Sequence, residues 1–599
     1  MHPKKSSGPR RTAKSCRPLL AALSLACPAQ AEIESELDPL VVSALRTPVE
    51  PGLITSAVTS LDPRDLEKRG VLDLRDALNE SPGVISTSTA GQTGAAGSLF
   101  IRGTTTADSQ LIVDGIRLSD ATTPLGNFLA GTRLDDLGRI EVLRGPQSAI
   151  HGGESVGGVL WLETANGRDR PGGRLRLEGG SFDSHDAHLS YGGSNEAFSW
   201  FAGIGKGGTR NDAIDQDFRR SRAALRFEWM PAEEVTLGVT FRATDSRFDF
   251  PGFFGPNVDE LDAALGTIYL EARPTDAWLA RMTMGYYRES YDNQGFFGNF
   301  GTDLDRTAIH TDHVIDFGPH HRLLAGASFE QTDFSNTIGT DVSADRFGAY
   351  LGWQWRPVDR FVTDAVLRWQ DDQSYGDEFT WRVGAAWEFI EGTRVRGGIG
   401  RAFRAPTFLD LYGTAFGAGD PNLKAQTSLG WDLGIEHQLA EDHQLTLTWF
   451  ENSIENRIRS LPTPPVNLPG DTPARGLETA IDGSWCDGRY GYRLAWTFLD
   501  ESLQDQPEHT ATASFDWRPL DRLLLGVGAT YVDERSYGGA PLDDYLLLRI
   551  YGSYRIRDHL TVHGRVENLA DSGYQLSNIG GTVVEGSGLG AFAGVTAEF

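Results

Sequence analysis

The sequence predicts a transmembrane β-barrel of about 22 antiparallel strands, with an N-terminal α+β domain that fills the lumen as a plug. Three observations predict this fold class. No run of about 18 apolar residues follows the N-terminal segment, which argues against a membrane-spanning helix. Apolar and polar residues alternate from about Gly172 to the C-terminus, and short turns recur along that region at nearly regular spacing.

The first segment reads as an export signal. Basic residues between Lys4 and Arg17 precede an apolar run over 19–27, and an A-x-A cleavage site ends at Ala31. We therefore expect residues 1–31 to be a signal peptide that is removed.

Residues 32–46 form a separate segment, in which "LDPLVVSALR" (37–46) looks like a short strand with no partner strand nearby. Its side chains divide between two faces: Leu40, Val42 and Ala44 on one, Val41 and Ser43 on the other. Pro39 cannot donate a ladder hydrogen bond, which limits pairing mainly to the residues after it. Such a strand can add to an exposed sheet edge of another protein.

Residues 47–166 have the mixed pattern of a small α+β domain. A helix is expected to begin at Asp62-Pro63 and stop at Gly70, and a second helix around Leu74 to Leu78 should end before Pro82. Short aliphatic strands are expected over residues 99–101, 111–113, 140–143 and 159–162.

Residues 167–599 alternate with period two. In "EVTLGVTFR" (234–242), Val235, Leu237, Val239 and Phe241 share one face. In a soluble sandwich that face would line a core, whereas in an outer-membrane barrel it faces lipid and the polar face lines a wet lumen.

The turns favour the barrel. "WMPAEE" (229–234), "WRPVDR" (355–360) and "WRPLDR" (517–522) each place a Trp at a strand end before a charged turn that contains Pro. Trp suits a membrane interface, and Pro suits a turn. With comparable turns near Asn195, Pro274, Pro319, Glu391, Glu441, Asp487 and Arg557 there are about ten, which gives about 22 strands. "AFAGVTAEF" (591–599) is expected to close the barrel against its first strand.

Charge and motifs argue against other classes of protein. A net charge of -27 argues against nucleic acid as a partner. The sequence contains no G-x-S-x-G elbow and no H-E-x-x-H pair, so we expect neither an enzyme nor a catalytic cofactor. A passive porin is the other alternative, but a filled lumen does not conduct.

Four runs in the plug carry a family resemblance: "SPGV" (81–84), "LFIRGT" (99–104), "LIVDGIRL" (111–118) and "IEVLRGPQSAIHGGESVGGVL" (140–160). With "FRAPTFLDLYG" (403–413) and "VENLADSGY" (566–574) in the barrel, the chain resembles the TonB-dependent outer-membrane receptors. One departure is His151, where the family commonly has Tyr.

The resemblance implies active import of a large, scarce nutrient across the outer membrane of a Gram-negative bacterium, by a monomer surrounded by outer-membrane lipids. It also implies that TonB pulls on a TonB box, formed here by Asp38, Pro39, Leu40, Val41, Val42, Ser43 and Ala44. "DPLVVSA" followed by Arg46, "WEFIEG" (387–392) and the compact barrel are most similar to the vitamin B12 (cobalamin) receptors. The expected ligand is cobalamin or another corrinoid, and a ferric siderophore is the alternative.

The resemblance also implies roles for single residues. Arg102, Asp114, Glu141 and Arg144 are expected to form structural ion pairs that hold the charged plug in a polar lumen. Substrate contacts are expected from neutral hydrogen-bonding groups at the plug apex: Gln92, Thr93, Ser119, Thr122, Thr123 and Asn127. Flexible linkers rich in Gly, Thr and Ser are the alternative for these loops.

Calcium is a further expectation by resemblance, since the cobalamin receptors order two outer loops with calcium. Carboxylates one residue apart can share a hard cation that prefers six to eight oxygens. The expected ligands are Asp215, Asp217, Asp249 and Asp259, with Asp212 and Asp262 behind them, in loops over 211–218 and 245–262. Acidic, solvated loops without metal are the alternative.

Overall fold

A computed structural model describes residues 41–88, 91–118, 128–129, 131–252, 255–295, 298–414, 417–460, 464–503, 506–537, 540–579 and 582–599. The expected signal peptide and the first three residues of the predicted TonB box, Asp38, Pro39 and Leu40, lie outside these ranges. Within them, no helix is both long enough and apolar enough to cross a membrane.

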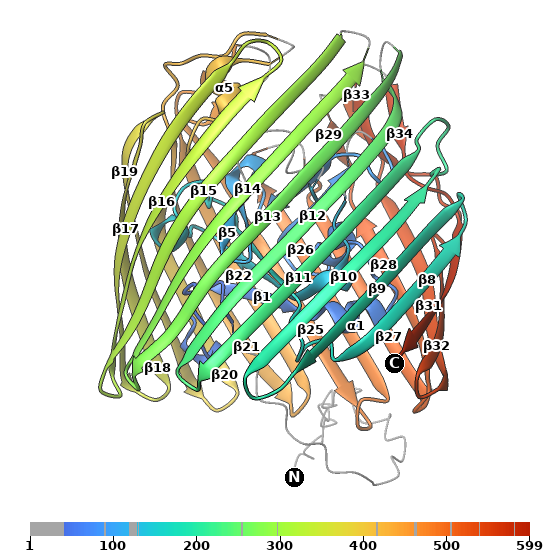
Figure 1. Cartoon of the computed structure of the whole chain (residues 1–599), viewed down its shortest axis with the longest axis horizontal. Coiled ribbons are helices and arrows are strands. Elements are labelled where there is room, and N and C mark those ends of the chain that lie inside the picture. The colour runs from blue at the N-terminus through green and yellow to red at the C-terminus, as the bar shows by residue number, and fades with distance from the viewer. Residues whose placement is uncertain are drawn as a thin grey trace, which may run out of the picture. The chain divides into compact units, whose positions relative to one another are not determined.

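The described part of the chain forms a closed barrel of 22 antiparallel strands, as predicted (Figure 1). The last strand pairs with the first, with Phe592 opposite Gly180. In chain order the strands are β8 (Gly172–Gly180), β9 (Ser184–Ser194), β10 (Phe198–Thr209), β11 (Phe218–Ala232), β12 (Val235–Gly252), β13 (Gly255–Thr275), β14 (Trp278–Gly295), β15 (Gly298–Phe317), β16 (His321–Asn336), β17 (Asp341–Val358), β18 (Phe361–Asp372), β19 (Gly376–Ile390), β20 (Thr393–Arg404), β21 (Gln426–Ala440), β22 (His443–Glu455), β25 (Asp471–Trp485), β26 (Tyr490–Glu501), β27 (His509–Leu520), β28 (Leu523–Val532), β31 (Tyr545–Arg557), β32 (Leu560–Glu567) and β35 (Gly590–Glu598).

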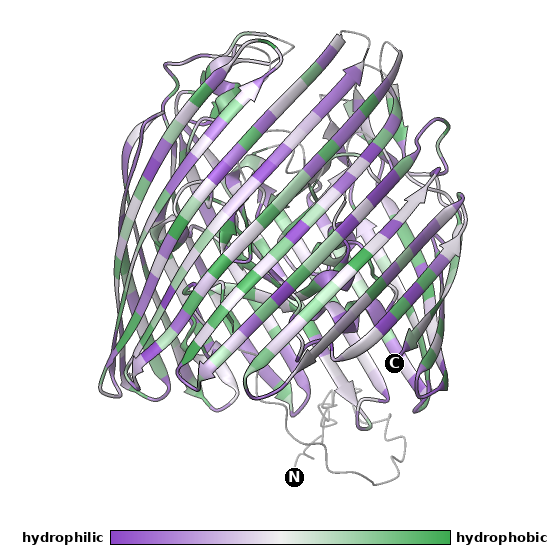
Figure 2. Cartoon of the chain, in the orientation of Figure 1, coloured by the Kyte–Doolittle hydropathy of each residue, from purple (hydrophilic) through white to green (hydrophobic). Residues whose placement is uncertain are grey.

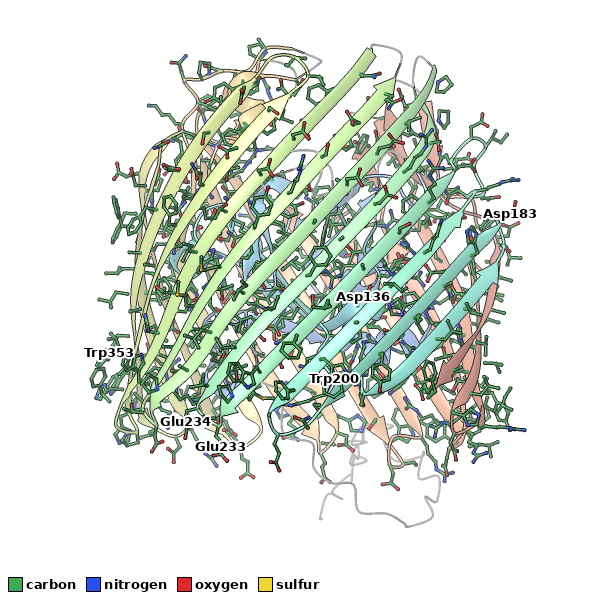
Figure 3. All side chains as sticks on the ribbon, in the orientation of Figure 1. Asp136, Asp183, Trp200, Glu233, Glu234 and Trp353 are labelled. Carbon is green, nitrogen blue, oxygen red and sulfur yellow. The ribbon has the colours of Figure 1, made fainter. Side chains whose placement is uncertain are left out.

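Hydrophobic and hydrophilic residues alternate along the barrel strands nearest the viewer in Figure 2. On β12, Leu237 and Phe241 point outward and are exposed, whereas Thr240 is only 2% exposed. Trp353 projects from the outer surface near the end where Glu233 and Glu234 form a short turn (Figure 3). This arrangement fits an apolar band with aromatic residues at the membrane interface.

The short turns lie where the sequence predicts them, but several strands are much longer than the expected ten residues. β13 has 21 residues, and its partner β12 ends only at Gly252. The described part of the segment 245–262, expected to be an outer loop, is therefore mostly paired strands. Backbone pairing continues where apolar alternation fades, because a strand outside the membrane needs no lipid-facing side chains.

Shorter elements cover the outer end of the barrel. They are α5 (Phe408–Tyr412) and the hairpins β23 (Ile458–Arg459) with β24 (Val466–Asn467), β29 (Arg535–Tyr537) with β30 (Ala540–Leu542), and β33 (Gln575–Ile579) with β34 (Thr582–Glu585).

The plug is a mixed sheet with helices inside the barrel. Its sheet order is β1-β6-β7-β4-β5, and β2 pairs with β3. Both predicted helices and all four predicted strands are present. The elements are η1 (Pro51–Leu53), β1 (Ala57–Leu61), α1 (Pro63–Lys68), α2 (Leu74–Leu78), β2 (Val84–Ser88), β3 (Gly97–Ile101), η2 (Thr106–Asp108), β4 (Ser109–Val113), β5 (Ile116–Arg117), η3 (Leu134–Asp136), β6 (Leu137–Arg144), α4 (Ser148–His151) and β7 (Gly158–Thr164).

One side of the plug packs against the barrel wall through apolar side chains. The plug core shares a buried cluster with Leu265, Tyr287 and Leu304 of β13, β14 and β15. A second cluster includes Val314 and Tyr350 of β15 and β17. Smaller apolar clusters also join Val156 to β20, β22 and β25, and Ala165 to β10 and β11, but the most extensive apolar contact lies on the side of β13 to β17.

Candidate functional site

The described residues of the predicted TonB box, Val41 to Ala44, are folded into the lumen. Val41 pairs with Val49 through two 2.9 Å backbone hydrogen bonds, and residues 43–46 form a turn. The free extended strand expected here is therefore absent over these residues. Val42 and Ala44 are buried beside Ile150 and Trp161, so burial within the plug replaces pairing with another sheet.

Two plug side chains hold this segment. The Glu141 carboxylate accepts hydrogen bonds from the Val42 amide at 3.1 Å and the Ser43 amide at 2.7 Å. The His151 Nε2 lies 2.7 Å from the Ser43 carbonyl oxygen. Arg46 then pairs with Asp312 of β15 at 3.3 Å, which links the end of the segment to the barrel.

The other three predicted scaffold residues divide into two groups. Arg102 pairs with Glu478 of β25 at 2.8 Å and Asp432 of β21 at 2.7 Å, and Arg144 lies 3.3 Å from Glu478. Asp114 instead accepts hydrogen bonds from the amide and hydroxyl of Thr164, both at 2.7 Å. Asp114 therefore joins two plug strands rather than the plug and the barrel.

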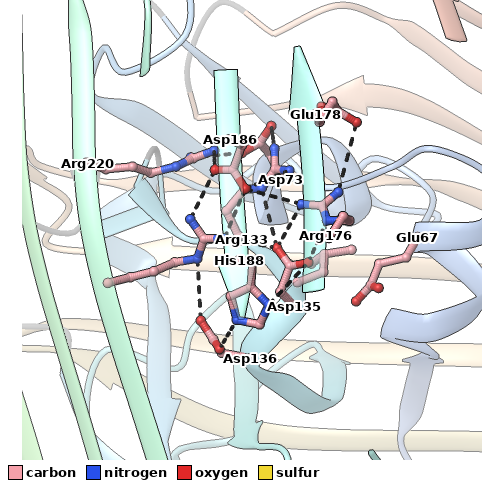
Figure 4. Close-up of polar contacts among 12 residues, drawn as sticks. Glu67, Asp73, Arg133, Asp135, Asp136, Arg176, Glu178, Asp186, His188 and Arg220 are labelled. Atoms are coloured by element: carbon pink, nitrogen blue, oxygen red, sulfur yellow. Dashed lines mark hydrogen bonds and ion pairs between the residues drawn. The ribbon is translucent and has the colours of Figure 1, made fainter. Parts of the chain in front are cut away.

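The larger polar anchor was not predicted. Asp135 of the plug pairs with Arg176 of β8 at 2.9 Å and Arg222 of β11 at 3.2 Å, and Asp136 pairs with His188 of β9 at 2.7 Å (Figure 4). Burial would raise the pKa of Asp135, but Arg176, His188 and Arg222 outweigh it and hold this pKa well below its usual range.

The sequence carried a signal for this anchor. "RLDDLG" (133–138) puts two adjacent carboxylates in the plug, and "RRSR" (219–222) places arginines on alternate positions of a barrel strand, where Arg220 and Arg222 face inward. Charged side chains that face a lumen need partners.

At the plug apex, Gln92 and Thr93 contact the connection between β10 and β11. The Gln92 amide donates to Gln216 Oε1 at 2.8 Å, and the Gln92 Oε1 accepts from the Asp212 amide at 2.8 Å. The Thr93 amide donates to Asn211 Oδ1 at 3.1 Å. Ser119, Thr122, Thr123 and Asn127 lie outside the described residues.

Two of the four predicted calcium ligands have other side-chain partners. Asp249 pairs with Arg247 at 2.7 Å, and Asp259 accepts hydrogen bonds from Tyr291 and Asn293. Only a backbone bond, from the Asp249 amide to the Asp217 carbonyl, links two members of the set. Among the residues that the structure describes, no three His, Cys, Asp or Glu side chains gather as a metal site requires. Calcium binding, with Asp215 included, stays a prediction.

A large cavity opens at the outer end, between the plug apex and strands β26 to β28. Its volume is about 910 Å³, and its described lining contains no Asp or Glu. Many hydroxyl and amide side chains line it, among them Ser98, Thr105, Gln506, Thr510 and Thr530, together with Tyr531, Tyr537 and Tyr545. This lining suits a large ligand with many neutral hydrogen-bonding groups.

Four arginines also line this cavity: Arg404, Arg457, Arg459 and Arg535. Arg457 and Arg535 donate to the backbone carbonyls of Leu503 and Gln575. Burial lowers the pKa of Arg457, as do the neighbouring charges of Arg404 and Arg459. The cavity therefore offers positive charge that a negative group on a ligand would balance.

Comparison with known proteins covers nearly the whole chain. The family model described as "TonB dependent receptor-like, beta-barrel" matches residues 161–569, and the "TonB-dependent Receptor Plug Domain" model matches residues 53–159. A vitamin B12 transporter, BtuB, from Photobacterium profundum is 26% identical over 592 residues, which cover 93% of this chain and 95% of the relative. BtuB from Vibrio vulnificus is 26% identical over 617 residues, with 94% and 95% covered.

Solved structures share the fold at lower identity. The ferric-catecholate import receptor Fiu of E. coli superposes with a TM-score of 0.78 at 16% identity, covering 92% of this chain and 98% of that chain. A ferric enterobactin receptor, PfeA, from Pseudomonas aeruginosa gives a TM-score of 0.77 at 19% identity, covering 92% and 100%. These similarities support the architecture alone.

Proposed function

We propose that this chain, which belongs to the TonB-dependent receptor family, imports a corrinoid of the cobalamin type. The receptor lies in the outer membrane of a Gram-negative bacterium and transports its ligand into the periplasm. The observation that carries the choice of ligand is the similarity to two vitamin B12 transporters along almost the entire chain.

The outer cavity supports this choice. A corrin ring carries several amide side chains at its edge, and the cavity presents hydroxyl and amide partners from both plug and barrel, such as Thr105 and Thr530. Its volume of about 910 Å³ suits a ligand larger than most metabolites. The tyrosines offer flat apolar faces to the ring.

A ferric siderophore is the second candidate, and the arginines of the cavity favour it. A ferric catecholate is strongly anionic and would gain charge-assisted hydrogen bonds from Arg457 and Arg459. A corrinoid with one phosphodiester would use fewer of them.

Equilibrium binding to the purified full-length protein separates the two ligands. We expect cyanocobalamin to bind well below micromolar concentration in calcium, and a ferric catecholate siderophore to bind far more weakly. Cobalamin binding that is micromolar or weaker would overturn the corrinoid proposal.

The double variant Arg457→Ala/Arg459→Ala sharpens this comparison. If the ligand is a ferric catecholate, its affinity should fall by at least about tenfold for each lost charged hydrogen bond. A corrinoid should lose no more than about tenfold in total. Arg210→Ala, which removes an exposed arginine that pairs with Asp183 away from the cavity, serves as the matched control.

A further inference from the structure

The contact between plug and barrel differs from one wall to another. Ion pairs join the plug to β8, β9 and β11, and apolar clusters join it to β13, β14 and β15. Along β26, β27 and β31 a series of cavities lies between the plug and the wall, and a few polar contacts cross it. The Gly83 amide donates to the Thr497 hydroxyl at 2.7 Å, Thr512 donates to the Asn79 carbonyl at 3.2 Å, and Arg549 donates to the Arg69 carbonyl at 2.9 Å.

Three cavities follow one another along this wall. The outer cavity of about 910 Å³ shares Asn79 and Thr512 with a middle cavity of about 390 Å³. The middle cavity shares Arg69, Arg493 and Ser514 with a lower cavity of about 690 Å³. The lower cavity is lined by the short turns at Gly392 and Asp442, so it lies at the periplasmic end.

A small polar bridge, made of Arg69, Glu80, Arg493 and Ser514, separates the middle cavity from the lower one. Glu80 pairs with Arg69 at 2.5 Å and with Arg493 of β26 at 3.3 Å. Arg69 also donates to the Ser514 hydroxyl of β27 at 3.2 Å. Among the described residues, no buried apolar cluster includes a side chain of β26, β27 or β31.

We propose that the substrate passes between the plug and strands β26, β27 and β31, and that the Glu80 bridge is the gate of this path. The cavities above and below the bridge are already present, so opening requires that Glu80 separates from Arg493 and that Arg69 moves from β27. The hydrogen bonds from Arg549 to the Arg69 carbonyl and from Thr512 to the Asn79 carbonyl must break as well. Pulling on the plug by TonB has the least packing to break on this wall. The inference rests on the transport function but not on the identity of the ligand.

Breaking the bridge should open a leak without any ligand. In planar bilayers, the full-length Glu80→Ala and Glu80→Ala/Arg493→Ala proteins should show single-channel openings and a several-fold higher small-solute permeability than the unchanged protein. Glu80→Ala leaves Arg69 paired with Asp65 at 3.3 Å, so the plug should remain folded.

Glu330→Ala is the matched control, because it removes a 2.6 Å ion pair between Arg117 of the plug and β16, away from the three cavities. It should not leak. An unchanged permeability in the double variant, or an equal leak in Glu330→Ala, would overturn the path.

Thiol labelling in cells tests the same path by a second route. Thr512, Ser514 and Asp516 lie on the inward face of β27. Thr512 lines the outer and middle cavities, Ser514 lines the middle and lower cavities, and Asp516 lines the lower cavity. In a chain without native cysteines, an external membrane-impermeant thiol reagent should label Thr512→Cys in every background. It should label Asp516→Cys only with Glu80→Ala, or while ligand is being imported. Labelling of Asp516→Cys in the intact, resting receptor would contradict a closed gate. If Asp516→Cys stayed unlabelled both in the Glu80→Ala background and during import, the proposed route would be wrong. Neither result depends on which ligand binds.

Discussion

The backbone amide of Ser43 donates a 2.7 Å hydrogen bond to the carboxylate of Glu141, 98 residues away in the sequence. The same carboxylate accepts from the Val42 amide and pairs with Arg139 at 2.9 Å. The buried Glu141 carboxylate, together with His151, thus holds the segment on which TonB is expected to pull.

Replacing this carboxylate should release the segment. Glu141→Ala removes hydrogen bonds to a charged acceptor, each of which contributes about 1.5 to 3 kcal/mol. Trypsin should then cleave after Arg46 much faster than in the unchanged protein.

The control is Glu163→Gln, which alters a carboxylate that also pairs with Arg139 at 3.4 Å. If Glu163→Gln exposes Arg46 as strongly as Glu141→Ala does, the effect comes from the sheet as a whole, and Glu141 is not the holding group.

Val41→Pro should abolish energised uptake and leave ligand binding intact. Proline removes the amide that a partner strand would need. In the resting structure the same amide pairs with the Val49 carbonyl at 2.9 Å, so the variant also loosens the segment.

Val49→Pro separates the two effects, because it breaks the other hydrogen bond of the same pair, from the Val49 amide to the Val41 carbonyl, without altering the predicted TonB box. Uptake of radiolabelled ligand by cells is the measurement. Full uptake by Val41→Pro, or equal loss in both variants, would contradict a TonB box at this position.

The barrel was predictable because its signal is local. The alternation around Leu237 and Thr240 predicts which side chains face lipid and which face the lumen, and Trp355 and Trp517 each stand at the start of a predicted turn. The alternation weakens beyond the membrane, so the sequence predicts loops where the outer halves of β12 and β13 are paired strands.

The contacts of the plug were not predictable in the same way. Glu141 was identified as a scaffold residue, but its partners are two backbone amides, which carry no residue-specific signal. The outer arginines Arg457 and Arg535 lie in separate outer segments that only the closed barrel brings to one cavity. Such pairings depend on the register and curvature of many strands together.

His151 makes the docking of the N-terminal segment sensitive to pH. Burial, and then the charge of Arg46, hold the pKa of His151 well below its ordinary value of about 6.5, with Arg368 and His310 acting in the same direction. The released histidine binds a proton below about pH 6.5 and the docked one does not, so docking weakens as the pH falls below that value.

Cleavage after Arg46 should therefore accelerate between about pH 7 and pH 5.5, once corrected for the activity of the protease. His151→Gln keeps a side-chain donor for the Ser43 carbonyl but does not titrate, and it should flatten the profile. His185→Gln changes an exposed histidine and should leave the profile as it is. A profile that is the same in His151→Gln as in the unchanged protein would rule out this histidine as the sensor.

Calcium should raise the affinity for the ligand if Asp215 and Asp217 bind it. Asp215 has a positive φ of 59°, which Asn tolerates better than Ala, so Asp215→Asn/Asp217→Asn removes the charges with the least disturbance of the backbone. The calcium-dependent gain in affinity should disappear in this variant, as measured by equilibrium binding with calcium and with a chelator. Asp183→Asn is the matched control, because Asp183 also has a positive φ, 51°, and lies on an exposed outer turn. An unchanged response to calcium in the double variant would show that these carboxylates do not hold the ion.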